Sequence, residues 1–443
     1  MSGDTAPTVA DVLAARLREL GVRRTWGLPL ADLDHVPVDD ADLAVLLADA
    51  DGRLGEVDGG GRLGAALLHG GILHLSSAPG GVAPLQTVGS VEELLDALAE
   101  PAGIVLPATT ALHLDLALDE PVAPDVRATA SVERVPVLTL SPSLAGLRLV
   151  VLAGTGVVRA RAVPGLHDLR STAVATVVLT WGARGAERRD SPYLGGVGGL
   201  QTRDLALAGL DDADVIVLTG VDPAELPEGS LEGRVVQEVP PRQLAALCAG
   251  WPTPPSGTVP DRAGDAPALA VPLQALFEDD AAPVTGARAA LQLAGVLPDR
   301  GVCVADPGPA GFWVARSFPT SIPGSSCVPA TVEPGFAVAA ALVAAMEDRP
   351  CVAVVDDRGG SEPLDPVSGA LLDLARATGR SVAVQAWSPD GPAVDAAAHV
   401  ELLQEALAGG GVRVDRVGVR TEVPDELVDL AGPPVASFGV PAN

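Results

Sequence analysis

Lysine is absent from this sequence of 443 residues: all 29 basic residues are arginine, and the only asparagine is Asn443. Aromatic residues make up 2% of the chain, so any hydrophobic core has to be built from alanine, valine and leucine. Tyrosine, phenylalanine and methionine are also scarce, and all these residue types have AT-rich codons. The bias therefore indicates a GC-rich genome; selection against modifiable amines is the alternative interpretation.

Positive charge is scarce as well, and the formal net charge is −28. Such a chain repels polyanions, which argues against nucleic acid or an anionic membrane as partner. No apolar run reaches the length of a membrane span, and MSGDTAPTVADV has no basic segment before an apolar one. We therefore expect a cytoplasmic protein. The four cysteines form no CxxC pair, so the sequence suggests neither a zinc site nor a disulfide framework.

Helical and strand-like segments alternate along three regions. The first opens with the helix TVADVLAARLRELGV, for which Thr8 is a plausible N-cap, and continues with strands at 72–77 and 103–107 around a helix at 91–100. Such alternation predicts parallel sheets covered by helices. The second region spans LRLVVLAGTG to ADVIVLTGVD, and a Pro- and Gly-rich stretch separates it from the third. We place the domains at 1–135, 136–250 and 276–443, with a linker at 251–275.

The order of these segments resembles the thiamine diphosphate-dependent superfamily of acetolactate synthase, pyruvate oxidase and 2-oxo acid decarboxylase. DVLAARLRELGVRRTWGLP, DGGGRLG and LSSAPGG are similar to its pyrimidine-binding domain. VVLAGTGV and WGARGAERRDSPYLGGVGG are similar to its central domain, and VCVADPGPAGFWVAR, EPGFAVAAALVAAM and CVAVVDDRGG to its diphosphate-binding domain. The resemblance implies an α/β fold with three doubly wound parallel-sheet domains: pyrimidine-binding-like, Rossmann-like central and diphosphate-binding-like.

The stretch VVDDRGGSEP occupies the place of the family's cofactor loop, which reads Gly-Asp-Gly and is followed by Asn-Asn. Asp357 matches the family aspartate, but both flanking glycines are replaced. Where the family has Asn-Asn the chain reads VAVQAW, in which Gln385 is the only amide. Oxygen ligands suit Mg²⁺, and glycines let backbone N–H groups approach phosphates. The resemblance thus implies metal ligands at Asp356, Asp357 and Gln385. The implied diphosphate contacts are Asp306, Gly308, Gly335, Arg358 and Gly359.

The family's catalytic glutamate aligns with a position at or near Ala50, which Asp49 and Asp51 flank. Either aspartate could stand in as the catalytic acid, although its side chain is one methylene shorter than that of glutamate. The alternative is that both are surface acids in a loop. Elsewhere, GTGVVR lacks the third glycine of a dinucleotide fingerprint, so no FAD is expected in the central domain. Trp313 and Arg316 could line a cleft or could be packing and surface residues.

Two functions follow from the resemblance. Because each of the features that the cofactor chemistry needs is altered, we favour a non-catalytic homologue that serves as a structural or regulatory subunit. The alternative is an active carboligase or decarboxylase that uses thiamine diphosphate and Mg²⁺ on a 2-oxo acid. In the family the cofactor lies between domains of two subunits. We therefore expect a homodimer or higher oligomer, or a heteromer with a full-length paralogue.

Overall fold

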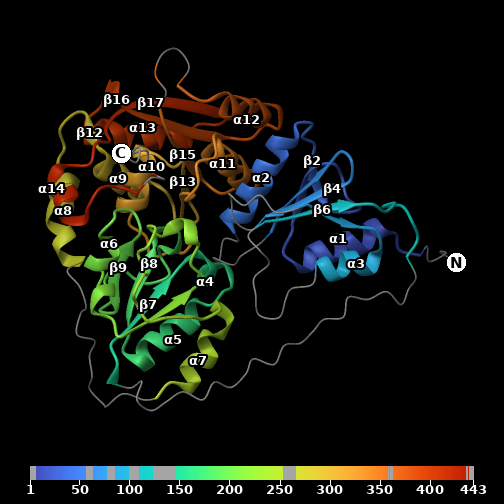
Figure 1. Ribbon diagram of the computed structural model, residues 1–443. Helices are drawn as coiled ribbons and strands as arrows, with labels where there is room; N and C mark the ends of the chain where they lie inside the picture. The colour runs from blue at the N-terminus through green and yellow to red at the C-terminus, as the bar shows by residue number, and fades with distance from the viewer. Residues whose placement is uncertain are drawn as a thin grey trace. The chain divides into compact units, whose positions relative to one another are not determined.

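The computed structural model describes residues 6–55, 63–76, 85–98, 109–122, 146–252, 266–357, 359, 363–435 and 438. The chain divides into two compact units. Unit 1 comprises Met1–Glu56 and Gly61–Val135, and unit 2 comprises Val57–Gly60 and Pro136–Asn443. Unit 1 holds one sheet and unit 2 holds two (Figure 1). The expected α/β class with three parallel-rich sheets is confirmed.

Unit 1 contains a six-stranded sheet in the order β2-β1-β3-β4-β6-β5. Its strands are β1 (Arg24–Gly27), β2 (Asp34–Val36), β3 (Gly64–Leu68), β4 (Ile72–Ser76), β5 (Leu85–Val88) and β6 (Thr109–Leu114). Strand β4 runs antiparallel to β3 and β6, whereas the other pairs are parallel. Only three residues join β3 to β4, too few for the crossover that a parallel pair needs. The strand expected at 103–107 lies outside the described residues.

Within the described residues, three helices accompany this sheet: α1 (Val9–Glu19), α2 (Ala41–Leu54) and α3 (Val91–Ala97). Thr8 is the N-cap of α1, as expected, and forms a capping box with Asp11. Helix α2 packs so closely on the sheet that a Cβ at Gly64 would lie 1.7 Å from the Ala48 carbonyl oxygen. Glycine is therefore required where the strand meets the helix.

Unit 2 begins with a five-stranded, fully parallel sheet in the order β11-β10-β7-β8-β9. Its strands are β7 (Leu149–Ala153), β8 (Thr176–Thr180), β9 (Leu194–Gly198), β10 (Val215–Thr219) and β11 (Val236–Glu238). The accompanying helices are α4 (Thr155–Arg159), α5 (Val163–Ala173), α6 (Asp204–Leu207) and α7 (Leu244–Gly250). Strand β7 is apolar throughout, β8 has an apolar centre between two threonines, and both are fully buried, which is typical of a parallel sheet covered on both faces.

The third sheet is also fully parallel and has the order β12-β17-β16-β15-β13-β14. Its strands are β12 (Val284–Thr285), β13 (Val302–Ala305), β14 (Ser326–Cys327), β15 (Cys351–Asp356), β16 (Val382–Ala393) and β17 (Val412–Arg420). Its helices are α8 (Ala270–Glu278), α9 (Gly286–Val296), α10 (Pro309–Ser317), α11 (Phe336–Met346), α12 (Pro366–Ala377), α13 (Ala396–Ala408) and α14 (Asp425–Ala431). Helix α11 is apolar all round and almost wholly buried, as a central helix must be.

One hydrophobic core joins the two sheets of unit 2. Trp181, which follows β8, packs edge-on against Phe438, and Phe438 contacts Phe312 of α10. The Trp181 indole N–H also donates to the Val328 carbonyl oxygen at 3.1 Å. These contacts explain why the two sheets belong to one compact unit. The C-terminal part of the expected linker at 251–275 is helical, since a 3₁₀ turn at Ala266–Leu269 runs into α8.

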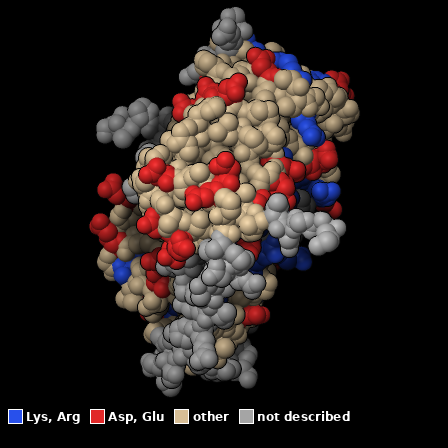
Figure 2. Space-filling model, turned by 90° about the vertical axis from the view of Figure 1, so that its right-hand side faces the viewer, with Lys and Arg blue, Asp and Glu red and all other residues tan. Residues whose placement is uncertain are grey.

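No helix within the described residues is long and apolar enough to cross a membrane. Figure 2 shows Asp and Glu side chains scattered over the displayed face, while Arg side chains gather in smaller groups toward one side. On this face, acidic side chains are therefore more widespread than basic ones.

Candidate functional site

The carboxyl end of the third sheet carries the aspartates that the sequence singled out. Asp306 directly follows β13, and its Oδ1 accepts the backbone N–H of Ala337 in the first turn of α11 at 2.7 Å. Asp356 ends β15, and its Oδ1 accepts the backbone N–H of Ala310 in the first turn of α10 at 2.9 Å. Each carboxyl group thus satisfies an N–H group at a helix N-terminus. Burial raises the pKa of Asp306 to about 7 and that of Asp356 to about 6.

The glycines expected at the diphosphate contacts have local structural roles. Gly308 has φ +150°, and a Cβ there would lie 2.0 Å from Asp356 Oδ2, so the glycine makes room for that carboxyl group. Gly335 is the N-cap of α11 with φ +84°, and a Cβ would lie 2.8 Å from Val367 Cγ1. Gly359 has open space around its Cα position. Arg358 lies outside the described residues.

Asp357, the residue that matches the family's metal ligand, is held by protein groups at both carboxylate oxygens. Its Oδ1 accepts the backbone N–H of Gly359 at 2.8 Å. Its Oδ2 accepts Nε of Arg416 at 2.8 Å, and a second guanidinium nitrogen lies at the same distance. The Asp357 side chain has no exposed surface, whereas that of Arg416 is 38% exposed. An arginine on β17 therefore supplies the positive charge that a metal ion would supply.

Gln385, the third expected metal ligand, is 1% exposed, and its amide oxygen faces other buried side chains. That oxygen accepts the indole N–H of Trp387 at 2.9 Å and lies 3.0 Å from Nε2 of His399. His399 Nδ1 in turn lies 2.7 Å from Oε1 of Gln292 on α9. Burial lowers the pKa of His399 to about 4. Gln385 thus belongs to a buried network beneath α9 and α13.

Together these contacts decide whether a metal-bound diphosphate fits. Within the described ranges, no three His, Cys, Asp or Glu side chains are arranged to hold a metal ion. Asp357 is paired, Gln385 is turned into the core, and Asp306 and Asp356 each support a helix N-terminus. The described residues at this sheet end do not fit the magnesium site that the resemblance implies.

In unit 1, Asp49 and Asp51 lie in the last turns of α2, and the alternative of surface acids in a loop was wrong. They are 7% and 2% exposed. Asp49 Oδ1 lies 3.0 Å from His74 Nε2 of β4. Asp51 Oδ2 accepts the indole N–H of Trp26 at 3.2 Å, and Arg24 Nε lies 3.8 Å away. Acidic residues next to glycine favour a loop, but the helix begins at the Asp40 cap and its buried face includes Ala44, Leu47 and Ala48.

The glycines of GTGVVR allow two segments of backbone to touch. A Cβ on Gly154 would lie 2.3 Å from Val221 Cα, and one on Gly156 would lie 2.7 Å from Gly220 Cα. The backbone of the turn after β7 therefore packs directly against the backbone of the turn after β10. No phosphate can approach these two glycines from the side that the second turn covers.

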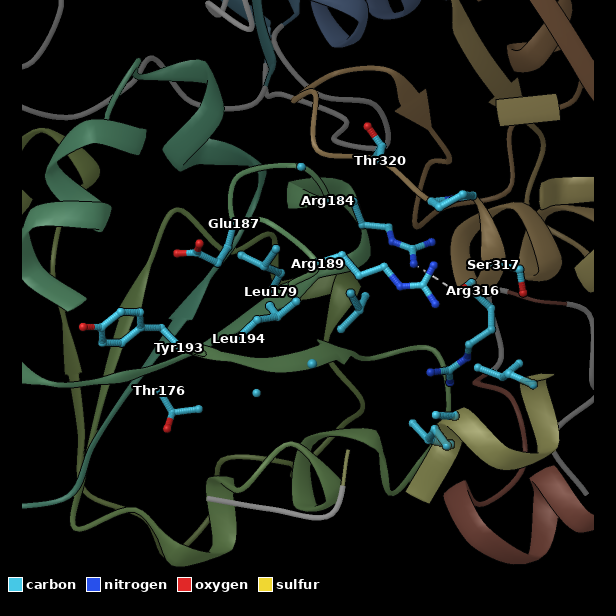
Figure 3. A pocket seen from close by; sticks show the side chains of 18 of the residues that line it. Thr176, Leu179, Arg184, Glu187, Arg189, Tyr193, Leu194, Arg316, Ser317 and Thr320 are labelled. Atoms are coloured by element: carbon cyan, nitrogen blue, oxygen red, sulfur yellow. Dashed lines mark hydrogen bonds between the residues drawn. The ribbon is translucent and has the colours of Figure 1, made fainter. Parts of the chain in front are cut away.

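A cavity of about 350 Å³ lies in unit 2 between β8, β9, α8 and the end of α10. The sequence pointed to only one of its residues, Arg316, as a possible cleft residue, whereas Trp313 is buried in the core. Three arginines line it, Arg184, Arg189 and Arg316, and we refer to it as the arginine cavity. Figure 3 shows Arg184 and Arg189 extending side by side from the loop before β9. The sequence signal was the cluster of arginines in WGARGAERRD, in a chain where basic residues are half as numerous as acidic ones.

Comparison with solved structures identifies the fold. The chain is similar to an X-ray structure from Mycobacterium smegmatis that is provisionally described as a thiamin diphosphate-dependent enzyme. The TM-score is 0.56 with 16% sequence identity, and the alignment covers 94% of this chain and 100% of that one. No protein-family model and no curated protein matches the sequence. The likeness shows that the chain has the fold of that structure.

Proposed function

We propose that this chain is a divergent homologue of the thiamine diphosphate-dependent enzymes of the acetolactate synthase, pyruvate oxidase and decarboxylase type, and that it acts as a non-catalytic structural or regulatory subunit. The observation that carries the proposal is the Asp357–Arg416 pair. The aspartate that should hold Mg²⁺ is buried and bound by an arginine instead. Binding a metal there would require breaking that pair and exposing a buried carboxylate.

Isothermal titration of the full chain with thiamine diphosphate, with and without Mg²⁺, tests this proposal. We expect no heat of binding and no increase in melting temperature from a protein that circular dichroism shows to be folded. Micromolar binding that depends on Mg²⁺ would overturn the proposal.

The subunit role is tested by mixing the chain with a full-length paralogue encoded in the same genome. Light scattering should show a heteromer, and the turnover of the paralogue should change when this chain is added. If the chain forms no heteromer and the turnover of the paralogue is unchanged, the proposed subunit role is wrong.

The buried carboxylates of α2 favour a second candidate, an active enzyme that acts on a 2-oxo acid with thiamine diphosphate and Mg²⁺. Asp49 and Asp51 lie in the segment where the family has its catalytic glutamate, and both are shielded from water. On this hypothesis Asp357→Ala abolishes turnover of 2-oxo acids without unfolding the protein. Turnover by the native chain that Asp357→Ala leaves unchanged would contradict it.

A further inference from the structure

The arginine cavity differs in charge from the rest of this acidic chain. Arg184, Arg189 and Arg316 line it together with one acid, Glu187. Glu187 is 2% exposed and is paired with Arg170. Because that carboxylate is already neutralised, the cavity wall carries a surplus of positive charge in a protein with a net charge of −28.

Two of the three arginines have no carboxylate partner among the described residues. Arg316 is paired with Asp204 at 2.8 Å, which balances its charge. Arg184 donates only to the backbone carbonyl oxygens of Ala315 and Arg316, at 2.5 and 3.1 Å. Arg189 is exposed at the mouth, where it also lines a neighbouring hollow. The wall therefore presents about two uncompensated positive charges.

These charges are close enough to interact unfavourably. Burial, together with repulsion by Arg316 and Arg189, lowers the pKa of Arg184 to about 9. Figure 3 shows the Arg184 and Arg189 guanidinium groups next to each other. A bound anion would relieve this repulsion, and paired guanidinium forks suit phosphate oxygens.

The rest of the wall is largely apolar. Strands β8 and β9 contribute Leu179 and Val197, and α8 contributes Leu273 and Phe277. Helix α8 has no fully buried residue, so its apolar face is only partly covered. A cavity of this volume with a charged end and an apolar body is typical of a small-molecule site.

From these observations we propose that the arginine cavity binds a phosphate monoester with a small apolar or aromatic body. A phosphate monoester carries a charge of about −1.5 to −2, which matches Arg184 and Arg189. Leu273 and Phe277 would contact its apolar body. The cavity lies away from the carboxyl end of the third sheet, so this proposal stands independently of the function proposed above.

Titration calorimetry of the full chain with phenyl phosphate, inorganic phosphate and phenol tests the inference. Phenyl phosphate should bind more tightly than inorganic phosphate, phenol should not bind, and added salt should weaken binding of both phosphates. Absence of phenyl phosphate binding would overturn the proposal. Equal affinity for the two phosphates would overturn the part that concerns the apolar wall.

Matched variants locate the site. Arg189→Ala should weaken phenyl phosphate binding about ten- to a hundredfold, the effect of losing a charged hydrogen bond. Arg188→Ala is the control, because the neighbouring Arg188 is exposed, does not line the cavity and is paired with Asp190. It should change the affinity less than about twofold. Equal losses in the two variants would indicate unspecific attraction and overturn the site.

A third variant, Leu273→Ala, tests the apolar wall. It should weaken binding of phenyl phosphate and leave binding of inorganic phosphate unchanged. If both affinities fall together, the apolar contact is wrong. Because Arg189 is exposed and Leu273 only partly buried, these variants should fold, which circular dichroism checks.

Discussion

The carboxyl end of the third sheet and the arginine cavity differ in whether their charged side chains have partners within the protein. At the sheet end, Asp357 is bound by Arg416, and Asp306 and Asp356 accept N–H groups from helix N-termini. In the cavity, Arg184 binds only backbone carbonyls and Arg189 has no carboxylate partner among the described residues. The sheet end is where the sequence pointed to a cofactor.

This difference separates residues that stabilise the fold from residues that are available to a ligand. A carboxylate whose oxygens are used by the protein gains nothing from a metal unless an existing interaction is broken. A guanidinium without a counter-charge gains from any anion of the right shape. Motif position alone does not distinguish the two cases, because it says nothing about the partners of a side chain.

The largest expected effect concerns the one cavity arginine that is paired. Arg316→Ala leaves Asp204, which is 1% exposed, as an uncompensated buried carboxylate. We expect the free energy of unfolding to fall by about 3–5 kcal/mol, measured by urea denaturation. Arg188→Ala breaks an exposed pair and should cost at most about 1 kcal/mol. Equal losses in the two variants would show that the Arg316–Asp204 pair contributes no more than a surface pair.

A pH-dependent effect is expected at the sheet end. The folded pKa of Asp306, about 7, lies above the ordinary value of 3.8, so its contribution to stability is complete below pH 4 and is lost as the pH rises through 7. Asp306→Asn keeps an acceptor for Ala337 and does not ionise. At pH 8 the variant should therefore be more stable than the native chain, by at most roughly 4 kcal/mol.

Urea denaturation between pH 4 and 8 measures this difference, and Asp299→Asn at an exposed position is the control. Parallel pH profiles for native chain and Asp306→Asn would contradict a raised pKa. Mg²⁺ should leave the difference unchanged. If the difference in stability between Asp306→Asn and the native chain shrinks when Mg²⁺ is added, a metal binds at the sheet end. The sheet end would then be available to a ligand, as the cavity is.

The smallest expected effect concerns the pair that replaces the metal. Arg416→Ala removes the charged partner of a buried carboxylate and should lower the free energy of unfolding by about 1–3 kcal/mol. Arg413→Ala on the same strand is the control, because Arg413 pairs with Asp415 and Glu405 at a partly exposed position. Loss of stability in Arg416→Ala that Mg²⁺ restores would show that Asp357 can still bind metal.

Much of the fold could be predicted from local patterns. The Thr8 cap, the helix at 91–100 and the apolar runs that form β7, β8 and β15 all follow from neighbours within a few residues. The strand expected at 72–77 is confirmed as β4, but its antiparallel direction was not predicted. The expected alternation of helices and strands implied parallel pairing and took no account of the short connection between β3 and β4. The helical position of Asp49 and Asp51 was missed because acidic residues next to glycine also favour loops.

The candidate sites depended on contacts between distant residues. Asp357 and Arg416 are 59 positions apart, and Arg316 and Asp204 are 112 apart. Propensity and periodicity arise between near neighbours, so the sequence by itself determined many of the helices and strands and the acidic, alanine- and valine-rich composition. Strand order decided which charges meet, because a side chain's partner is set by the elements that pack beside it. Only the tertiary structure therefore showed the occupied carboxylates and the uncompensated arginines.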